Sequence, residues 1–192
     1  MTAATPDMEV SINKTDDDKV LEHIKHPLEH KWCFWMFTNS KRNWEDNLVR
    51  LTTFDTVEDY WCLHHHMKVP SELTLGQDYA IFKNDIRPMW EDDANRLGGR
   101  WLISFEKKRN SNIDTIWLFV TLLLIGENFQ HSDIICGAVV NVRVKSKIGI
   151  WISESSNKEA ILEIGEKLKD QLGLHFRINF HKHASTENMF TI

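Results

Sequence analysis

Apolar residues recur along this chain with two different periods. Three segments have the spacing of amphipathic helices, with apolar residues three and four positions apart, and the first stands behind two plausible capping residues, Asp55 and Thr56. The segments begin after Asp55 and Thr56, after Asn112, and near Asn157. The third segment stops at Gly173, a residue type that commonly follows a helix end. The pattern therefore predicts three helices.

Seven further segments are rich in β-branched and aromatic residues and are separated by short connections. They cover Trp32–Phe37, Leu48–Phe54, Tyr79–Phe82, Arg100–Phe105, Ile135–Lys145, Lys147–Ile152 and His175–Phe180. A twisted, mostly antiparallel sheet with the helices on one face is the economical arrangement of these elements. The predicted fold class is α+β.

Polar and acidic residues dominate the start of the chain. Asp16, Asp17 and Asp18 lie among several threonines, and residues 1–25 contain no Phe, Trp or Tyr. Such a segment buries too little apolar surface to offset the entropy lost on ordering. From His26 onward aromatic residues appear at once, and no linker or repeat divides the rest. We therefore expect a flexible acidic tail over residues 1–25 and one domain over residues 26–192.

Charge and cysteine content narrow the class of protein. The 192 residues include 28 acidic and 23 basic side chains, a net charge of −5, which argues against broad coating of nucleic acid but leaves a local basic pocket open. Cys33, Cys62 and Cys136 are far apart and form no CxxC pair, which is typical of a reducing compartment. No apolar run reaches the roughly 20 residues that span a bilayer. The sequence predicts a cytoplasmic protein without a membrane partner.

Tryptophan is unusually frequent, with eight Trp against two Tyr. Trp44 and Trp90 both stand in polar, loop-like surroundings, and Glu91 follows the second. Either indole alone is explained by covering the edge of a core. Together they indicate a ligand with a flat π-system, preferably a cationic one, because the ring quadrupole attracts positive charge.

Basic residues alternate with apolar ones before and after Ser146. If the two segments pair as a hairpin, Arg143, Lys145, Lys147 and Trp151 line one wall. A solvated polar face with one surface tryptophan accounts for the alternation equally well.

These groups together suit one ligand. A carboxylate such as Glu91 can accept two N–H groups from the edge of guanine. Arg143, Lys145 and Lys147 can hold phosphates. Guanine methylated at N7 is flat and cationic, and it is joined to a triphosphate at the start of messenger RNA. Capped mRNA is therefore the predicted ligand, and no cofactor is expected.

Six sequence blocks stand in an order and spacing that are highly specific. They are His26–Leu28, Phe54–Asp59, Pro88–Asp92, Gly98–Ile103, Cys136–Arg143 and Ile150–Trp151. With them the chain resembles the cytoplasmic mRNA cap-binding proteins of the translation initiation factor 4E family, over nearly all of residues 26–192. The resemblance implies a curved, eight-stranded antiparallel sheet backed by three helices on its convex face.

The resemblance also implies roles for individual residues at the base. Trp44 and Trp90 resemble the pair that stacks on both faces of the methylated guanine. Glu91 resembles the acid that reads the Watson–Crick edge, and the backbone N–H of Trp90 would bind the guanine O6. Trp151 resembles the residue that contacts the N7-methyl group.

The phosphate ligands follow from the same resemblance. Arg143 and Lys147 resemble the residues that hold the phosphates, and Lys145 and Arg100 are auxiliaries. On the convex face the family receives a short helical motif from the scaffold factor 4G or from competing 4E-binding repressor proteins. The residues carried over for that contact are His26, Pro27, Val57, Trp61, Leu118, Phe119 and Leu122.

The helix that begins at Ile113 supports a contact on its outer side, because it is apolar around its whole circumference. Leu118, Phe119, Leu122 and Ile125 lie outside its main apolar stripe, so they need cover from a partner helix or from the fold itself. Phe119 stands where the family usually has an acid, which removes an expected ion pair with the partner. A cap-binding paralogue that sequesters messages or specialises their translation is therefore the alternative function.

The sequence argues against two other functions, metal binding and catalysis. His64, His65 and His66 are consecutive on a predicted helix, so they point roughly 100° apart and do not converge on one ion. The sequence has no GxSxG, HExxH or P-loop motif. We therefore expect neither a metal site nor an enzyme.

Overall fold

A single antiparallel sheet of eight strands organises the part of the chain that the computed structural model describes, residues 24–43, 45–105, 112–185 and 187–192. The strands are β1 Pro27–Phe37, β2 Leu48–Thr56, β3 Asp78–Lys83, β4 Gly99–Ser104, β5 Ile135–Asn141, β6 Lys147–Ile152, β7 Asn179–Lys182 and β8 Asn188–Thr191. Their order across the sheet is β2-β1-β3-β5-β6-β4-β7-β8. Trp44 and residues 1–23 of the predicted tail lie outside the described ranges.

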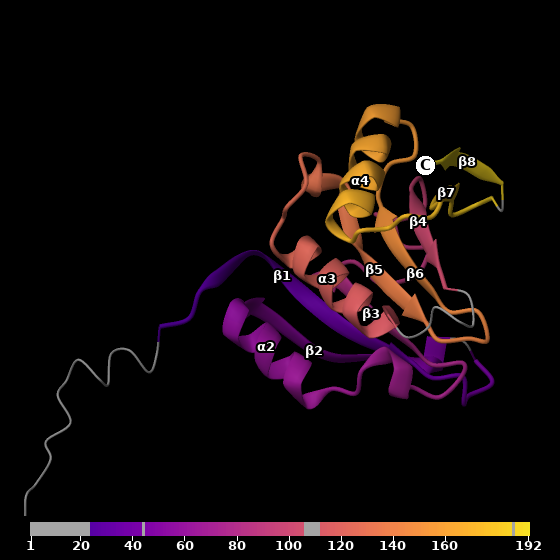
Figure 1. The fold of residues 1–192 in the computed structure, drawn as a ribbon. Coiled ribbons are helices and arrows are strands. Elements are labelled where there is room, and N and C mark those ends of the chain that lie inside the picture. Colours follow the sequence, from indigo (N-terminus) through magenta and orange to yellow (C-terminus); the bar gives the residue numbers. More distant parts are fainter. Residues whose placement is uncertain (1–23, 44, 106–111, 186) are drawn as a thin grey trace, which may run out of the picture.

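Three α-helices of the described residues cover the convex face of the sheet (Figure 1). They are α2 Val57–His66, α3 Ile113–Ile125 and α4 Lys158–Gln171. The predicted α+β class and the antiparallel sheet with helices on one face are thus confirmed. Within the described ranges, no helix has the length and apolar character needed to cross a bilayer.

The helix ends follow local sequence signals. The side chains of Thr56 and Asn157 each accept the N–H three residues on, at 3.2 and 3.1 Å, and so cap α2 and α4. The side chain of Asn112 makes no such bond at the start of α3. After α4, Gly173 has a φ of +58°, the left-handed conformation that glycine adopts without strain and that ends the helix.

Three strand predictions were wrong at their ends. β1 begins at Pro27, whereas the pattern predicted a strand from Trp32. β5 stops at Asn141, whereas the alternation predicted a strand to Lys145. Arg143 and Lys145 lie instead in the turn to β6, where the Ser146 hydroxyl accepts the N–H of Arg143 at 3.3 Å and donates to its carbonyl at 3.1 Å. These local side-chain bonds replace the strand ladder, which alternation alone does not reveal. β7 begins at Asn179 and not at residue 175, because its register is set by pairing with β4.

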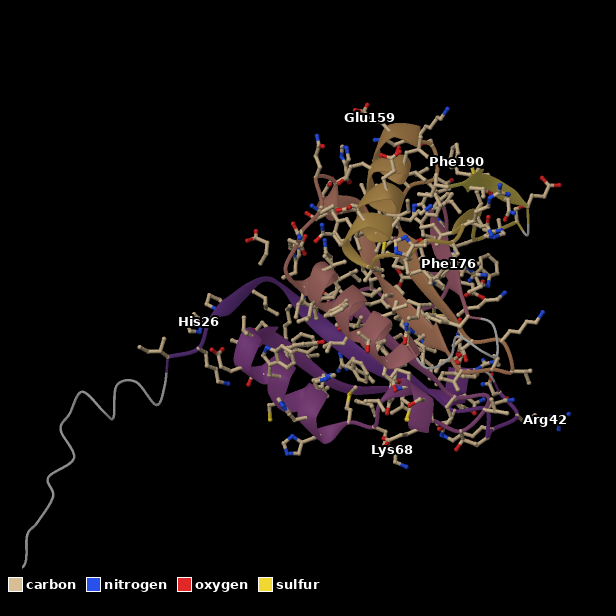
Figure 2. The ribbon with its side chains drawn as sticks, viewed as in Figure 1. His26, Arg42, Lys68, Glu159, Phe176 and Phe190 are labelled. Carbon is tan, nitrogen blue, oxygen red and sulfur yellow. The ribbon has the colours of Figure 1, made fainter. Side chains whose placement is uncertain are left out.

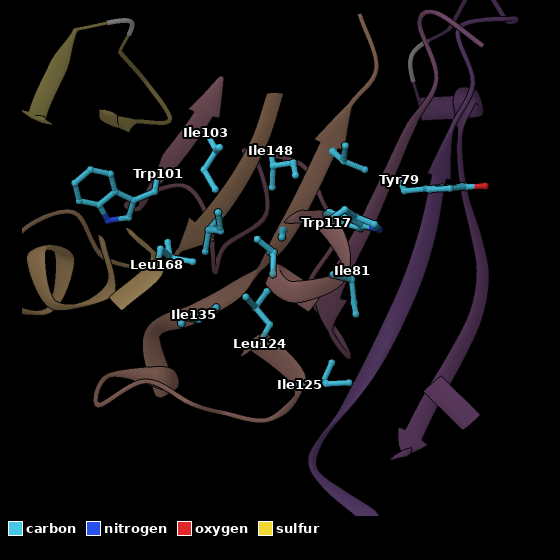
Figure 3. Packing of buried hydrophobic residues seen from close by; sticks show 14 of the residues in the cluster. Tyr79, Ile81, Trp101, Ile103, Trp117, Leu124, Ile125, Ile135, Ile148 and Leu168 are labelled. Carbon is cyan, nitrogen blue, oxygen red and sulfur yellow. The ribbon is translucent and has the colours of Figure 1, made fainter. Parts of the chain in front are cut away.

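The main core lies between the sheet and the helices (Figure 3). Trp101 of β4 is fully buried, and its indole N–H donates to the Ile161 carbonyl of α4 at 2.9 Å. Gly165 allows this close packing, since a Cβ there would lie 2.4 Å from the Trp101 ring. Because successive residues of a strand point to opposite faces of the sheet, Arg100 and Leu102, the neighbours of Trp101 in β4, point to the concave face.

Candidate functional site

The concave face of the sheet holds a cavity of about 600 Å³. Its walls combine aromatic, acidic and basic side chains from the strands with side chains from loops at its rim. Five of the residues predicted to bind a nucleotide line it: Trp90, Glu91, Arg100, Arg143 and Trp151. The structure therefore brings together side chains that lie up to 61 positions apart in the sequence.

The loop from β3 to β4 presents Trp90 and Glu91 at the rim. Asn95 is fully buried beneath them, and its amide nitrogen donates to the carbonyls of Arg87 and Met89 at 2.9 and 2.8 Å. Met89 is buried, while Trp90 is 54% exposed and Glu91 is exposed. The hydrogen bonds of Asn95 thus hold the loop in a shape that exposes the Trp90 indole and the Glu91 carboxylate at the cavity rim.

The loop from β1 to β2 borders the other side of the cavity. Asn47 is 2% exposed and binds the loop through both ends of its amide. Its oxygen accepts the N–H groups of Ser40 and Lys41 at 3.0 and 2.7 Å, and its nitrogen donates to the carbonyls of Lys41 and Asn43 at 2.8 Å each. Trp44, predicted to stack on the ligand, lies between these residues but outside the described ranges.

The floor of the cavity is apolar. Trp151 of β6 is 7% exposed and packs edge-on against Phe82 with ring centroids 5.5 Å apart. Gly149 lies two residues before it on the same face. A Cβ at Gly149 would come within 3.4 Å of Leu102 and 3.5 Å of the Trp151 indole nitrogen. The missing side chain therefore keeps the floor hollow beside the indole.

Arg143 supplies a positive wall. Its two terminal nitrogens form a bidentate ion pair with Asp78, at 2.5 and 3.0 Å, and one of them also donates to the Val142 carbonyl at 2.9 Å. Asp78 is 8% exposed, so the guanidinium is held by a nearly buried carboxylate. Such a pairing fixes the planar fork of an arginine and leaves its remaining N–H groups for an anion.

The two predicted lysines lie further out. Lys147 pairs with Asn141 at the outer end of the β5–β6 hairpin and shares the face of Gly149 and Trp151, but it does not line the cavity. Lys145 is exposed in the turn and does not line it either. The predicted hairpin is therefore found, since β5 pairs with β6. Of its three basic residues, Arg143 lines the cavity, and Lys145 and Lys147 do not.

Arg100 and His183 form a desolvated group beside Trp151. The Arg100 guanidinium carbon lies 5.8 Å from the Trp151 ring centroid, and burial lowers the pKa of Arg100. The His183 ring lies 4.1 Å from the Trp151 ring. Burial, and then repulsion by Arg100, lower the pKa of His183 to about 4, so its imidazole is neutral near pH 7.

Sequence reasoning missed Asp78 and His183. Asp78 stands just before the apolar run Tyr79–Phe82, where an aspartate is typical of a turn. Its place beside the cavity depends on the register of β3 on β5, which brings it opposite Asn141. His183 follows the short strand β7, and no pattern signals that it lies on an indole 32 positions earlier.

The histidines of α2 are engaged with their own helix. The Nδ1 atoms of His65 and His66 each lie 2.7 Å from the backbone carbonyl four residues back. Burial lowers the pKa of His64. Among the described residues, no group of three or more His, Cys, Asp or Glu side chains is arranged to hold a metal ion.

On the convex face, the predicted partner-binding residues of β1 and α2 lie together. His26 sits where the chain enters the fold beside α2 (Figure 2). Its backbone N–H and its Nδ1 lie 2.9 and 2.6 Å from the Glu58 carboxylate, which lowers the pKa of Glu58 to about 2. The N–H of Val57 donates to the His26 carbonyl at 2.9 Å, so residues 26–27 are joined to the start of α2. Trp61 follows Val57 by one helical turn and is half-buried.

α3 completes this surface. The hydroxyls of Tyr60 and Thr121 are hydrogen-bonded, which connects α2 to α3. Leu118 and Leu122 are half-buried against the main core, and Phe119 is 45% exposed. Ile125 is 5% exposed, so of the two expected covers, a partner helix or the fold itself, the fold covers this residue. The fold itself therefore covers most of α3 and leaves Phe119 in solvent.

Fold and site together define an α+β protein with an aromatic and basic cavity in the concave face of an eight-stranded sheet. The sequence matches the family described as eukaryotic initiation factor 4E over residues 27–190. The chain therefore belongs to the eukaryotic initiation factor 4E family.

Individual relatives agree with this assignment. The chain is 51% identical over 176 residues to eukaryotic translation initiation factor 4E1 of Drosophila melanogaster, covering 89% of this chain and 68% of the relative. The solved structure of Ascaris suum eIF4E-3 with an m2,2,7G cap is 38% identical and superposes with a TM-score of 0.85, covering 88% of this chain and 99% of that one. Schistosome eIF4E complexed with m7GpppA and 4E-BP is 34% identical with a TM-score of 0.81, covering 88% and 100%.

Proposed function

We propose that this protein binds the 7-methylguanosine cap of messenger RNA in the concave cavity and takes part in cap-dependent translation initiation. The observation that carries the proposal is the convergence of Trp90, Glu91, Arg100, Arg143 and Trp151 on one cavity in a chain of the 4E family. Cap-bound structures of two relatives support the same ligand class.

Each group has a task in this proposal. Trp44 and Trp90 stack on the two faces of the cationic base, and Glu91 accepts the N–H groups of its edge. The indole of Trp151 contacts the N7-methyl group, beside the hollow left by Gly149. These roles follow the chemistry of the side chains, because a desolvated cation binds best over an aromatic face.

The phosphates extend from the base toward the positive wall. Arg143, already oriented by Asp78, binds them directly, and Arg100 adds a desolvated positive charge within the same cavity. Lys147 and Lys145 reach inward from the hairpin end, because lysine side chains are long and flexible.

Magnitudes explain why the phosphates are needed. Two stacking faces at about 1–3 kcal/mol each and two charge-assisted hydrogen bonds at about 1.5–3 kcal/mol each total roughly 5–12 kcal/mol. Association costs on the order of 4–15 kcal/mol. The base pocket alone is therefore marginal, and the phosphate contacts decide whether binding is useful.

The convex surface is the second part of the proposal. A short helix from the scaffold factor 4G, or from a 4E-binding repressor, docks on a surface of seven residues: His26, Pro27, Val57, Trp61, Leu118, Phe119 and Leu122. Its support is the junction of residues 26–27 with α2 and the bond between α2 and α3, which make these side chains one continuous surface. Binding there recruits the translation machinery to the capped message.

The remaining expectations complete the proposal. The protein is a binding protein and not an enzyme, because each cavity group has a recognition task. One domain spans residues 26–192, preceded by an acidic tail over residues 1–25. The site of action is the cytoplasm, where translation of capped messages takes place.

Retention on immobilised 7-methyl-GTP tests the cap-binding function. The protein should be retained, eluted by free 7-methyl-GTP, and displaced far less by GTP. Equal displacement by the two nucleotides would refute recognition of the methylated base. Glu91→Gln, which keeps the shape but removes the negative charge, should be retained poorly.

Phe119 favours a second candidate function, a cap-binding paralogue that engages the scaffold weakly. Its side chain is 45% exposed on the proposed docking surface, where an acid would attract a basic partner residue. Titration of scaffold and repressor peptides against the cap-retained protein separates the two functions. Phe119→Glu should tighten scaffold binding if the second function is correct, and an unchanged affinity would count against it.

A further inference from the structure

We propose that His183 is a positioning residue for cap recognition: its ring backs the Trp151 indole and so determines discrimination between methylated and unmethylated guanine. This inference rests on the proposed function of the concave cavity. It concerns a side chain that does not line the cavity and that the sequence pattern does not single out.

The geometry places the imidazole directly against Trp151, which lines the cavity, while His183 itself does not line it. His183 follows β7, and its backbone N–H donates to the Gly98 carbonyl at 3.2 Å, which ties it to the strand pair that carries Arg100. Its ring centroid is 4.1 Å from that of Trp151, with the planes 41° apart. Phe82 meets the same indole edge-on at 5.5 Å. Two rings therefore hold the indole.

In the described part of the chain, ring contacts and not hydrogen bonds hold the imidazole. Both ring nitrogens of His183 are shielded from solvent, and neither has a hydrogen-bond partner among the described residues. The ring thus serves as a flat, uncharged support for Trp151.

Neutrality of this support matters for a cationic base. Arg100 already brings one positive charge to within 5.8 Å of the Trp151 ring centroid. A second positive charge on His183 would oppose a guanine that is cationic because of its N7-methyl group. Burial and Arg100 keep the imidazole unprotonated, so His183 adds no second positive charge beside the indole that faces the ligand.

Removal of the ring should loosen the indole selectively. In His183→Ala, Trp151 loses its closest ring contact and can turn into the vacated space, away from the N7 substituent. Contacts to the guanine edge and the phosphates remain, so GTP should bind nearly as before. Aromatic pairs contribute about 0.5–1.5 kcal/mol, so the affinity for 7-methyl-GTP should fall about 2- to 13-fold.

The experiment measures the dissociation constants of 7-methyl-GTP and GTP by calorimetry for the wild-type full chain and its variants. His183→Ala should lower the ratio of GTP to 7-methyl-GTP dissociation constants, and His183→Phe, which restores a neutral ring, should keep it near the wild-type value. His183→Gln, neutral and without a ring, tests the same loss if the alanine variant unfolds. His175→Ala, an exposed histidine outside both proposed surfaces, is the matched control.

The outcomes separate the role from its alternatives. An equal loss of affinity for both nucleotides in His183→Ala, or a loss of discrimination in His183→Phe, would overturn the positioning role while leaving cap binding intact. Equal binding of both nucleotides by the wild-type protein would overturn the proposed function itself, and this role with it.

Discussion

Replacement of Trp90 by alanine tests the stacking proposal at its most exposed point. The indole is 54% exposed at the cavity rim, while the loop beneath it is held by Asn95 independently of the Trp90 side chain. Loss of one stacking face costs about 1–3 kcal/mol, which predicts a 7-methyl-GTP dissociation constant about 5- to 150-fold higher. Trp90→Phe keeps a smaller face and should give an intermediate value.

Calorimetric titration with 7-methyl-GTP measures this loss, and far-UV circular dichroism and thermal unfolding check that the fold persists. Trp61→Ala is the matched control, because it removes the same side chain from the opposite face of the sheet and should leave the nucleotide affinity unchanged. A dissociation constant within about twofold of wild type for a folded Trp90→Ala protein would refute the stacking role, since a twofold change is well below the contribution expected from one stacked base.

Three further changes probe other parts of the account. Asn95→Ala leaves two buried carbonyls without their donor, so chemical denaturation should show a loss of about 1–3 kcal/mol and titration a weaker affinity for 7-methyl-GTP; unchanged stability would contradict the anchoring role. Trp61→Ala should abolish binding of a scaffold peptide in a fluorescence anisotropy assay, and normal peptide affinity would show that the docking surface lies elsewhere. The unfolded chain protonates His183 near pH 6.5 but the folded protein only near pH 4, so stability should fall as the pH drops through this window, by about 2 kcal/mol between pH 7 and pH 5. His183→Phe should lack this part of the loss, and identical pH profiles of the two proteins would contradict the assignment.

Local signals were sufficient for the helices. Thr56 caps α2 where the sequence predicted a capping residue, and Asn157 caps α4, which the sequence predicted to start near it. Both caps join a side-chain oxygen to an N–H three residues on, which is short-range geometry. Gly173 ends α4 for the same kind of reason. The alternating strands were found as well, since period two marks a half-buried strand without knowledge of its partner.

Long-range pairing accounts for what the sequence did not show. β8 is only four residues long, and its existence depends on pairing with β7. The carboxylate of Asp78 reaches Arg143 only through the register of β3 on β5. His183 meets Trp151 only because β7 lies beside β4, and β4 beside β6. None of these contacts has a signature within a short window of sequence.

Residue types predicted which side chains share one site better than they predicted where the strands end. Trp90, Glu91 and Arg143 were expected together from their chemistry, and they line one cavity, while their roles toward a ligand stay a prediction. The turn that carries Lys145 was expected to be strand, because alternation of valines and basic residues has the same appearance in both. The hydrogen bonds between the Ser146 side chain and the Arg143 backbone stabilise the turn and not a strand.

The central claim is that the cavity recognises guanine by its N7-methyl group and its phosphates. Its most direct test is the pair of dissociation constants for 7-methyl-GTP and GTP, measured by calorimetry on the wild-type protein under one set of conditions. The account predicts binding of 7-methyl-GTP at least about tenfold tighter, since methylation makes the stacked base cationic. Equal dissociation constants for the two nucleotides would contradict it.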